Sequence, residues 1–569
     1  MSYHPASAEV HVEFSIPSST PDRAAAVSVL EDVQAPMRDG VRLGADVYLP
    51  DGCTPAPTIL IRQPYGRRTE DMGFDVVGRF FAAKGYACVV QDVRGKFSSE
   101  GEFDPGVHEV NDGYDTAEWA AAQEWSNGRL GCWGESYYGW TSYATAISGH
   151  PAIACIAPGD ITVDRRAGWM RQGAFLLNTT GYWAIAMDAQ NYADLAALDP
   201  YTLPLIDLPA SCGADGVFFR TLIEHLDDPE WWAERSLAGR LGEVRVPVLS
   251  WGGWYDNYIG PQLDDHAELM RIHPAPETVH LLVGPWDHEG TAEYTDRAVC
   301  LELPPTAEHR WAAYERFFDR YLLGVDNGFG ASGAVEVFML GANCWETLPT
   351  WPPPGVERRA LYLRSGGRLA LEAPTVEEPP DAYRYDPLDP VAATVGRNCW
   401  GLCTALADRR TLDARPDILR YTSDPLDEPV ELMGPIVAEL YAATSAVDTD
   451  FTVTLCDVFE DGTVNTIQDG IVRARYRDGF DAPSLVTPGE VVPYTVRLNA
   501  AAYVVGRGHR LRVDVSSSDF DRYDRNLNTG APTGQTADAV VAQQSVHHSP
   551  GRASRAVVSV RSKKSSESL

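Results

Sequence analysis

Ser136 stands in the stretch GRLGCWGESYYGW, which has the form of a nucleophilic serine turn. The usual pattern is Gly-x-Ser-x-Gly between a strand and a helix, and here Gly139 comes one residue late. An apolar run at 130–133 precedes the turn, and a helix-like segment at 140–147 follows it. Gly134 is expected to relieve strained backbone angles, and Gly139 to let the helix pack closely. The pattern therefore predicts that the Ser136 hydroxyl is a nucleophile.

Asp256 and His288 are the groups expected to activate this serine, because a serine nucleophile needs a histidine base oriented by a carboxylate. VLSWGGWYDN places Asp256 just past one predicted strand, and HLLVGPWDHEG places His288 just past the next. The chain order Ser136, Asp256, His288 is that of the α/β-hydrolases. Asp287 competes as the orienting carboxylate, but it adjoins the histidine in sequence, and adjacent side chains rarely face each other. The backbone N–H of Tyr137 is predicted to donate one hydrogen bond to the oxyanion.

The elements that must position these residues show the alternation of apolar runs and helical stretches that is typical of a parallel α/β sheet. Strands are predicted at 58–62, 87–91, 130–133, 153–157, 246–251 and 279–284, and helices at 76–84 and 112–125. A long amphipathic helix follows, with one stripe formed by Trp311, Tyr314, Phe318 and Leu322. We therefore expect a discontinuous α/β-hydrolase domain made of residues 28–160 and 242–345.

Two further domains are predicted from changes in composition. Residues 161–241 carry many aromatic side chains but no clear strands, which indicates a helical cap inserted over the sheet. After the turn-forming WPPPG, apolar runs such as IVAELYA and HRLRVDV alternate with turn signals, which indicates a C-terminal all-β jelly roll or sandwich at 346–560. The Ser- and Lys-rich end from about Arg552 is typical of a short disordered tail.

Composition and charge narrow the classes of partner. The 569 residues include 47 basic and 80 acidic side chains, and the net charge of -33 opposes binding to nucleic acid or to an anionic membrane surface. The N-terminal residues lack a signal-peptide pattern, and no segment approaches a membrane-spanning length of apolar residues. We therefore expect a cytoplasmic protein, and the sequence leaves a homo-oligomer open.

Neither a cofactor nor a metal is expected. Cys399 and Cys403 form a C-x3-C pair without a second pair or nearby histidines, which is a weak zinc signal. DFDRYDRNLN has carboxylates at short spacing but lacks the glycine and the terminal glutamate of a calcium loop. Gly506-Arg507-Gly508 precedes a predicted strand rather than a helix, so it does not indicate a nucleotide site.

Several motifs together resemble the CocE/NonD family of serine hydrolases. They are IRQPYGRR, QDVRGKFSSEGEF, GESYYG, GGWYDN and GPWDH, and the likeness extends from MRDGVRLGADVYLP to DRNLNTG. Gly-x-Ser-Tyr-x-Gly is this family's own form of the nucleophile turn. The resemblance implies Ser136 as nucleophile, Asp256 as acid, His288 as base and the Tyr137 N–H as an oxyanion donor. It also implies that Tyr65, in IRQPYG, is the second oxyanion donor, and that the chain has the three parts described above.

The resemblance also places the acyl-binding aromatic residues in the cap and just after the catalytic aspartate, which points to Trp169 and Tyr258. Trp400, in the predicted β domain, is expected to close one side of the pocket. These positions predict a serine hydrolase that cleaves esters, or reactive amides, of small acyl compounds through an acyl-enzyme on Ser136.

Three alternatives stay open from the sequence. An X-prolyl dipeptidyl-peptidase-like aminopeptidase would use the same three residues, with carboxylates in the cap to hold the substrate ammonium group. An acyltransferase would pass the same acyl-enzyme to an amine or alcohol. The non-enzymatic alternative is a saccharide-binding protein in which the hydrolase fold is vestigial.

Overall fold

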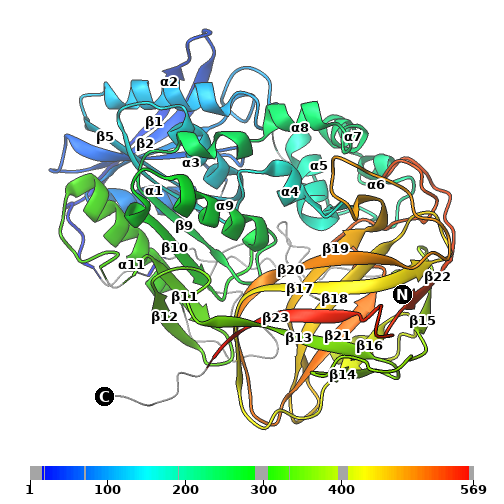
Figure 1. The fold of residues 1–569 in the computed structure, drawn as a ribbon. Helices are drawn as coiled ribbons and strands as arrows, with labels where there is room; N and C mark the ends of the chain where they lie inside the picture. The colour runs from blue at the N-terminus through cyan, green and yellow to red at the C-terminus, as the bar shows by residue number, and fades with distance from the viewer. Residues whose placement is uncertain are drawn as a thin grey trace, which may run out of the picture.

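The computed structural model describes residues 16–562, apart from 18–19, 70–71, 190, 192, 289–305, 332 and 395–407. Figure 1 shows a lobe with a helix-flanked sheet, blue to green, next to an all-β lobe, yellow to red. A group of helices coloured cyan to green lies at the upper right, above the β lobe. Three residues singled out from the sequence, Trp400, Cys399 and Cys403, lie outside the described residues.

Ten strands of the described chain form the first sheet, with the strands predicted from the sequence at its centre. Their order is β1 (Val27–Pro36), β2 (Arg42–Pro50), β4 (Ala87–Asp92), β3 (Ala56–Gln63), β5 (Ser126–Glu135), β6 (Ile153–Gly159), β9 (Val248–Gly253), β10 (Val279–Gly284), β11 (Val335–Met339) and β12 (Cys344–Leu348). From β4 to β11 neighbouring strands run parallel, and antiparallel pairs occur toward the two edges. β12 extends this sheet past the predicted limit at 345. The domain limits themselves stay predictions.

The inner strands are apolar because both faces of the sheet are covered. Every residue of β3, β4, β9 and β10 is buried. The helices of this lobe are α1 (Phe74–Ala83), α2 (Glu109–Ala121), α3 (Ser136–Ile147), α9 (Ile259–Ile272) and α11 (Ala307–Phe318). The first two confirm the helices predicted at 76–84 and 112–125. α11 buries Trp311, Tyr314 and Phe318 of the predicted stripe, and Leu322 is buried in the π-helical turn Asp319–Leu323 that follows.

Between β6 and β9 the chain is mostly helical, as the sequence predicts for the cap. The helices are α4 (Arg165–Trp169), α5 (Tyr182–Asp188), α6 (Leu208–Ser211), α7 (Val217–Glu224) and α8 (Pro229–Arg235), and a small ribbon is formed by β7 (Met170–Arg171) and β8 (Ala174–Phe175). The Asp164 side chain caps α4 by accepting the Ala167 N–H. Because α4 follows β6 closely, it lies at the sheet edge where the parallel strands end.

Eleven strands of the described chain form the second sheet, which confirms the all-β C-terminal lobe. The order is β15 (Asp381–Tyr385), β22 (Ala542–Val546), β17 (Val430–Thr444), β23 (Arg555–Arg561), β13 (Val356–Arg364), β14 (Arg368–Ala370), β16 (Leu419–Thr422), β21 (Arg510–Ser516), β18 (Asp450–Val458) and β19 (Val464–Arg473), with β20 (Val492–Val505) paired to β17. The predicted disordered tail from Arg552 is wrong for β23, which lies between β17 and β13. Three of its valines are buried, namely Val557, Val558 and Val560. Burial of these side chains stabilises the strand although polar residues surround it in the sequence.

The loop that follows β9 packs into the core of the β lobe. Trp254 and Tyr255 share a hydrophobic cluster with β-lobe residues such as Tyr503. The Gln468 side chain, on β19, donates a hydrogen bond to the Trp254 carbonyl at 2.8 Å. Asp256 comes next in the chain, so the β lobe supports the segment that presents it.

Candidate active site

Ser136 stands where β5 ends and α3 begins, in the strand-turn-helix context that the sequence predicts. Its φ is +52°, in the left-handed region that residues other than glycine rarely adopt. The strain expected at Gly134 therefore falls on Ser136 itself. Gly134 is needed for space, because a Cβ there would lie 2.4 Å from the carbonyl oxygen of Tyr138. At Gly139 a Cβ would lie 2.7 Å from the carbonyl oxygen of Gly159, so the late glycine lets α3 pack on β6 as predicted.

Ser136, His288 and Asp256 are joined in one line of hydrogen bonds. His288 Nε2 lies 3.0 Å from Ser136 Oγ, and His288 Nδ1 lies 2.5 Å from Asp256 Oδ2. Asp256 Oδ1 accepts the Tyr258 N–H at 2.5 Å, which fixes the carboxylate. Asp256 and His288 follow the ends of β9 and β10, which are neighbouring parallel strands. A histidine held in this way can accept the hydroxyl proton through Nε2.

Two further carboxyl groups, Glu135 and Asp160, lie near Asp256 and were not predicted. Burial raises the pKa of both, and in Asp160 the neighbouring charges of Asp256 and Glu135 raise the pKa further. Asp160 also accepts the Gly253 N–H at 3.2 Å, so it braces the end of β9. A raised pKa means that burial disfavours the charged form of both groups. Sequence position could have indicated Asp160, because it directly follows β6. Ser136, Asp256 and His288 likewise follow the ends of their strands.

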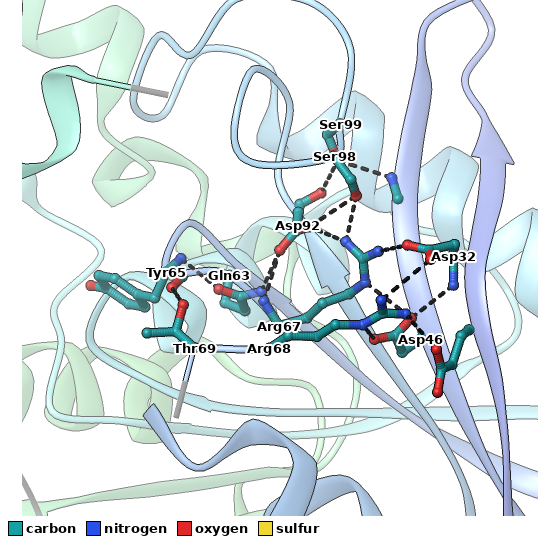
Figure 2. A network of polar contacts seen from close by, with 12 residues as sticks. Asp32, Asp46, Gln63, Tyr65, Arg67, Arg68, Thr69, Asp92, Ser98 and Ser99 are labelled. Atoms are coloured by element: carbon teal, nitrogen blue, oxygen red, sulfur yellow. Dashed lines mark hydrogen bonds and ion pairs between the residues drawn. The ribbon is translucent and has the colours of Figure 1, made fainter. Parts of the chain in front are cut away.

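The turn after β3 carries Tyr65 and is held by the network of polar contacts in Figure 2. The Gln63 side chain accepts the Tyr65 N–H at 2.5 Å and donates to Asp92 Oδ1 at 2.9 Å. The same Asp92 oxygen accepts the backbone N–H of Arg67 at 3.0 Å. The Thr69 hydroxyl donates to the Tyr65 carbonyl at 2.9 Å. Because Asp92 ends β4, this network ties the turn to the neighbouring parallel strand.

Arg67 closes the network on the side away from Tyr65, as Figure 2 shows. Its guanidinium forms ion pairs with Asp92 and Asp32, and its Nε lies 3.1 Å from Asp46 Oδ1. Arg67, Asp46 and Asp92 are buried, so these charge-assisted bonds are weakly screened and hold the turn in one geometry. The motifs IRQPYGRR and QDVRG therefore fold as one unit that sets the position of Tyr65.

The two predicted oxyanion donors, Tyr65 and Tyr137, are linked through Trp183. The Tyr65 hydroxyl accepts a hydrogen bond from Trp183 Nε1 at 3.2 Å. Trp183 stacks on the Tyr137 ring with 5.6 Å between centroids. The Tyr137 N–H belongs to the first turn of α3, where N–H groups have no acceptor within the helix. Their role as oxyanion donors stays a prediction.

A cavity opens at the serine. Its wall includes Ser136, His288 and the aromatic residues Tyr137, Trp140, Trp169, Trp183 and Tyr258. Trp169, from the cap, and Tyr258, just after Asp256, thus share the cavity that the resemblance assigns to them. The Tyr258 ring lies 5.3 Å from the His288 imidazole. Contact of these rings with an acyl group stays a prediction, and so does the role of Trp400, which is not among the described residues.

Comparison with known proteins decides the family. Residues 39–290 match the X-Pro dipeptidyl-peptidase (S15 family), and residues 327–557 match the X-Pro dipeptidyl-peptidase C-terminal non-catalytic domain. The cocaine esterase of Rhodococcus sp. (strain MB1 Bresler) is 34% identical over 94% of this chain and 98% of its own length. This chain belongs to the CocE/NonD family.

Solved structures support the same CocE/NonD fold. An alpha-amino acid ester hydrolase is 28% identical, with a TM-score of 0.82 over 98% of this chain and 100% of that one. An aminopeptidase from a marine sediment archaeon, Thaumarchaeota archaeon, is 26% identical, with a TM-score of 0.83 over 98% and 99% of the two chains. Membership of the CocE/NonD family makes the chain a serine hydrolase, so the saccharide-binding alternative is wrong.

In the part of the chain that the structure describes, no three His, Cys, Asp or Glu side chains are grouped so that they could hold a metal ion. No helix in the described ranges has the length and apolar character needed to cross a membrane. In the DFDRYDRNLN stretch, Asp521 accepts a hydrogen bond from the Tyr182 hydroxyl, and Asp524 accepts the Phe175 N–H at 2.7 Å. These carboxylates tie the cap to the β lobe.

Proposed function

We propose that the chain hydrolyses esters of small acyl compounds through an acyl-enzyme on Ser136. The hydrogen-bonded line from Ser136 through His288 to Asp256, with distances of 3.0 and 2.5 Å, is the observation that carries the proposal. His288 accepts the serine proton through Nε2. Asp256 keeps Nδ1 as a hydrogen-bond donor and stabilises the imidazolium that forms.

The reaction proceeds in two halves. Ser136 Oγ attacks the acyl carbon while its proton passes to His288 Nε2, and the carbonyl oxygen becomes an oxyanion. The Tyr65 hydroxyl and the Tyr137 N–H donate hydrogen bonds to this oxyanion. The intermediate collapses, the alcohol leaves with the proton from His288, and the acyl group stays on Ser136. Water then attacks the acyl carbon with His288 as base, which releases the acid and restores the serine.

The walls of the cavity favour an acyl group with apolar surface. Trp169, Trp183 and Tyr258 are each less than one-tenth exposed, and their rings exclude water while offering contact area. We assign contact with the acyl group to Trp169 and Tyr258. On this basis, benzoyl and other large apolar acyl esters should be cleaved with higher kcat/KM than acetyl esters.

The aminopeptidase and acyltransferase alternatives would use the same serine. An X-prolyl peptidase has to hold the free ammonium group of its substrate, which calls for carboxylates in the pocket. The described wall of the cavity contains neither aspartate nor glutamate, and this favours esters over N-terminal dipeptides. Acyl transfer differs from hydrolysis only in the acceptor, so a product assay separates the two.

We also infer a cytoplasmic location and no nucleic-acid partner. The cysteines among the described residues are all free, as expected in a reducing compartment. The net charge of -33 repels phosphate backbones. Cell fractionation tests the location, and light scattering of the purified chain tests whether it forms a homo-oligomer.

Labelling with a fluorophosphonate, followed by peptide mapping, tests the assignment of the nucleophile. We expect the label on Ser136, and we expect Ser136→Ala to lose both the label and the hydrolysis of 4-nitrophenyl acetate. Ser142→Ala is a matched control on the same helix, where the hydroxyl donates to the Tyr138 carbonyl at 2.9 Å. Label on another residue, or undiminished hydrolysis in Ser136→Ala, would contradict the proposal.

The same preparation separates the alternatives. Hydrolysis of 4-nitrophenyl esters in the presence of methanol or an amine reports the share of acyl transfer. Cleavage of glycyl-prolyl-4-nitroanilide with a kcat/KM above that of the esters would favour the peptidase.

A further inference from the structure

Lys96 is a buried lysine in the loop between β4 and α2, and its ammonium group reaches the cap. Its side chain is 0% exposed. Nζ donates one hydrogen bond to the Met187 carbonyl at 3.0 Å and another to the Ala189 carbonyl. Met187 lies in the last turn of α5, and Ala189 directly follows the helix. Because the last carbonyls of a helix have no donor within it, Lys96 satisfies backbone groups that α5 leaves open.

The loop that carries Lys96 has one tightly fixed shape. Lys96 stands between Gly95 and Phe97, whose φ angles of +72° and +48° are both in the left-handed region. A Cβ at Gly95 would lie 2.2 Å from the backbone nitrogen of Phe103, so the loop closes tightly on itself. A phenylalanine in the left-handed region costs free energy, and such strain persists only where the surrounding contacts enforce it. The loop is therefore a firm base for the ammonium group.

The same loop is fastened to the turn that carries Tyr65. Figure 2 shows the Ser98 hydroxyl between Arg67 and Asp92. This hydroxyl donates to Asp92 Oδ2 at 3.1 Å and accepts a hydrogen bond from Arg67. The Ser99 hydroxyl donates to the Asp92 carbonyl at 2.6 Å. The loop thus joins the Tyr65 turn to α5 of the cap.

Trp183 stands one helical turn before the Met187 carbonyl that Lys96 holds. Its Nε1 donates a hydrogen bond to the Tyr65 hydroxyl oxygen at 3.2 Å. Because this bond occupies one side of the oxygen, the Tyr65 O–H has to point elsewhere. Phe103, from the Lys96 loop, packs on Trp183 with 6.4 Å between ring centres. The position of α5 therefore sets the direction in which the Tyr65 hydroxyl can donate.

We propose that Lys96 is a positioning residue of the hydrolysis: its ammonium group fixes α5 on the β4 loop, and Trp183 then directs the Tyr65 hydroxyl toward the oxyanion. The proposal rests on the function proposed for Ser136 and on the donor role of Tyr65. A compact ammonium with three donors can bind two neighbouring carbonyls, whereas a guanidinium spreads its N–H groups in a planar fork. Lysine is rare in this chain, and Lys84 is the other lysine within the described residues.

A double-mutant cycle with Tyr65→Phe separates positioning from a purely structural role. The substrate is 4-nitrophenyl acetate, whose small acyl group limits contact with the cavity wall, and rates are expressed per active site titrated with a fluorophosphonate. We expect Lys96→Met to lower kcat by about tenfold or more, since a misplacement of about 1 Å can cost about 10²-fold. In the Tyr65→Phe background the hydroxyl that Lys96 positions is gone, so the same substitution should lower kcat by less than about twofold. If Lys96 only supported the fold, the two losses would multiply to within about twofold.

Lys84→Met is the matched control for the loss of a buried ammonium group. Lys84 directly follows α1, and its Nζ donates to the Thr20 carbonyl at 2.6 Å instead of to the cap. This variant should lose stability in a urea titration and keep its kcat.

Multiplying losses in the cycle, or an unchanged kcat in Lys96→Met, would overturn the proposal and leave the function proposed for Ser136 intact. An unchanged kcat in Tyr65→Phe would overturn it as well, because Lys96 would then have no donor to position. If the wild type cleaves no ester at all, the proposed function itself fails, and this proposal with it.

Should Lys96→Met not fold, the pH dependence of the wild type decides. Burial lowers the pKa of the Lys96 ammonium from 10.5 to about 8, and the negative charges of Asp188 on α5 and Asp92 on β4 oppose that shift. Above this pH the amine is neutral and holds the two carbonyls less strongly, because its hydrogen bonds are no longer charge-assisted. The kcat for 4-nitrophenyl acetate should therefore fall as pH rises through about 8. A kcat that stays constant from about pH 7 to about pH 10 would overturn the proposal.

Discussion

Replacement of Tyr65 by phenylalanine removes one hydroxyl beside the cavity and tests the proposed oxyanion site directly. The Tyr65 oxygen accepts a hydrogen bond from Trp183 Nε1 at 3.2 Å, and that bond does not use the hydroxyl proton. A developing oxyanion requires such a proton. Loss of one oxyanion donor typically lowers kcat by about 10²–10³, which corresponds to about 3–4 kcal/mol. We expect Tyr65→Phe to lower kcat by this factor with little change in KM.

The same substitution has a separate effect on stability. Trp183 loses the acceptor of its indole N–H, and an unpaired buried donor costs about 1–3 kcal/mol. The rate should therefore be expressed per active site titrated with a fluorophosphonate, while urea titration reports the free energy of unfolding. Trp183→Phe removes the same hydrogen bond but keeps the Tyr65 hydroxyl, so it should lower kcat less than Tyr65→Phe does.

Tyr86→Phe is the matched control for the loss of a buried phenol. The Tyr86 hydroxyl donates to Asp319 Oδ1 at 2.6 Å, elsewhere in the hydrolase lobe. This variant should lose stability and keep its kcat. A Tyr65→Phe enzyme with kcat within about threefold of the wild type, or with a change in KM alone, would refute the oxyanion role. Tyr65 would then be a structural or substrate-binding residue.

Asp265, on α9, accepts the Val163 N–H at 2.8 Å, and burial raises its pKa from 3.8 to about 7. Because the folded pKa exceeds the unfolded one, the free energy of unfolding should fall as pH rises between these two values, by at most about 4 kcal/mol. Urea titrations at pH 5 and pH 8 measure this fall, and Asp265→Asn should remove the part of it that comes from Asp265. Trp169→Ala and Tyr258→Ala should each narrow the kcat/KM advantage of 4-nitrophenyl benzoate over the acetate; equal rates for the two esters in the wild type would count against an aromatic acyl pocket. A chain that ends at Thr350 should be insoluble or inactive because the Asp256 loop packs on the β lobe, and a soluble, fully active truncation would show that the lobe is dispensable.

The centre of the first sheet could be predicted because its strands are buried on both faces. β3, β4, β9 and β10 are buried throughout, so each leaves a continuous apolar run in the sequence. β1 is mostly exposed, and its sequence VSVLEDVQAP includes acidic residues, so it leaves no such run. β23 was predicted as part of a disordered tail because serine and lysine dominate the composition of this end of the chain. The three valines of β23 are nevertheless buried in the β-lobe core.

The hydrogen-bonded triad of the candidate site could be predicted from the positions of its residues along the chain. Ser136, Asp256 and His288 each follow a strand, and parallel strands bring such residues to one edge of a sheet. Tyr65 required the family resemblance, because its link to the cavity runs through Trp183, far away in sequence.

The β lobe holds the segment that presents Asp256, although it supplies none of the three residues of the proposed catalytic triad. On one side of Asp256, the Trp254 carbonyl accepts a hydrogen bond from Gln468 at 2.8 Å. On the other side, the Asn257 side chain accepts one from Arg522 Nε at 3.3 Å. Both donors belong to the β lobe, so the segment that carries Asp256 is bound to that lobe on either side of the carboxylate. A displacement of this lobe would move Asp256 relative to the imidazole, and general-base catalysis depends on that alignment. We therefore expect the C-terminal lobe to contribute to kcat by positioning Asp256, even though no atom of it takes part in the proposed chemistry.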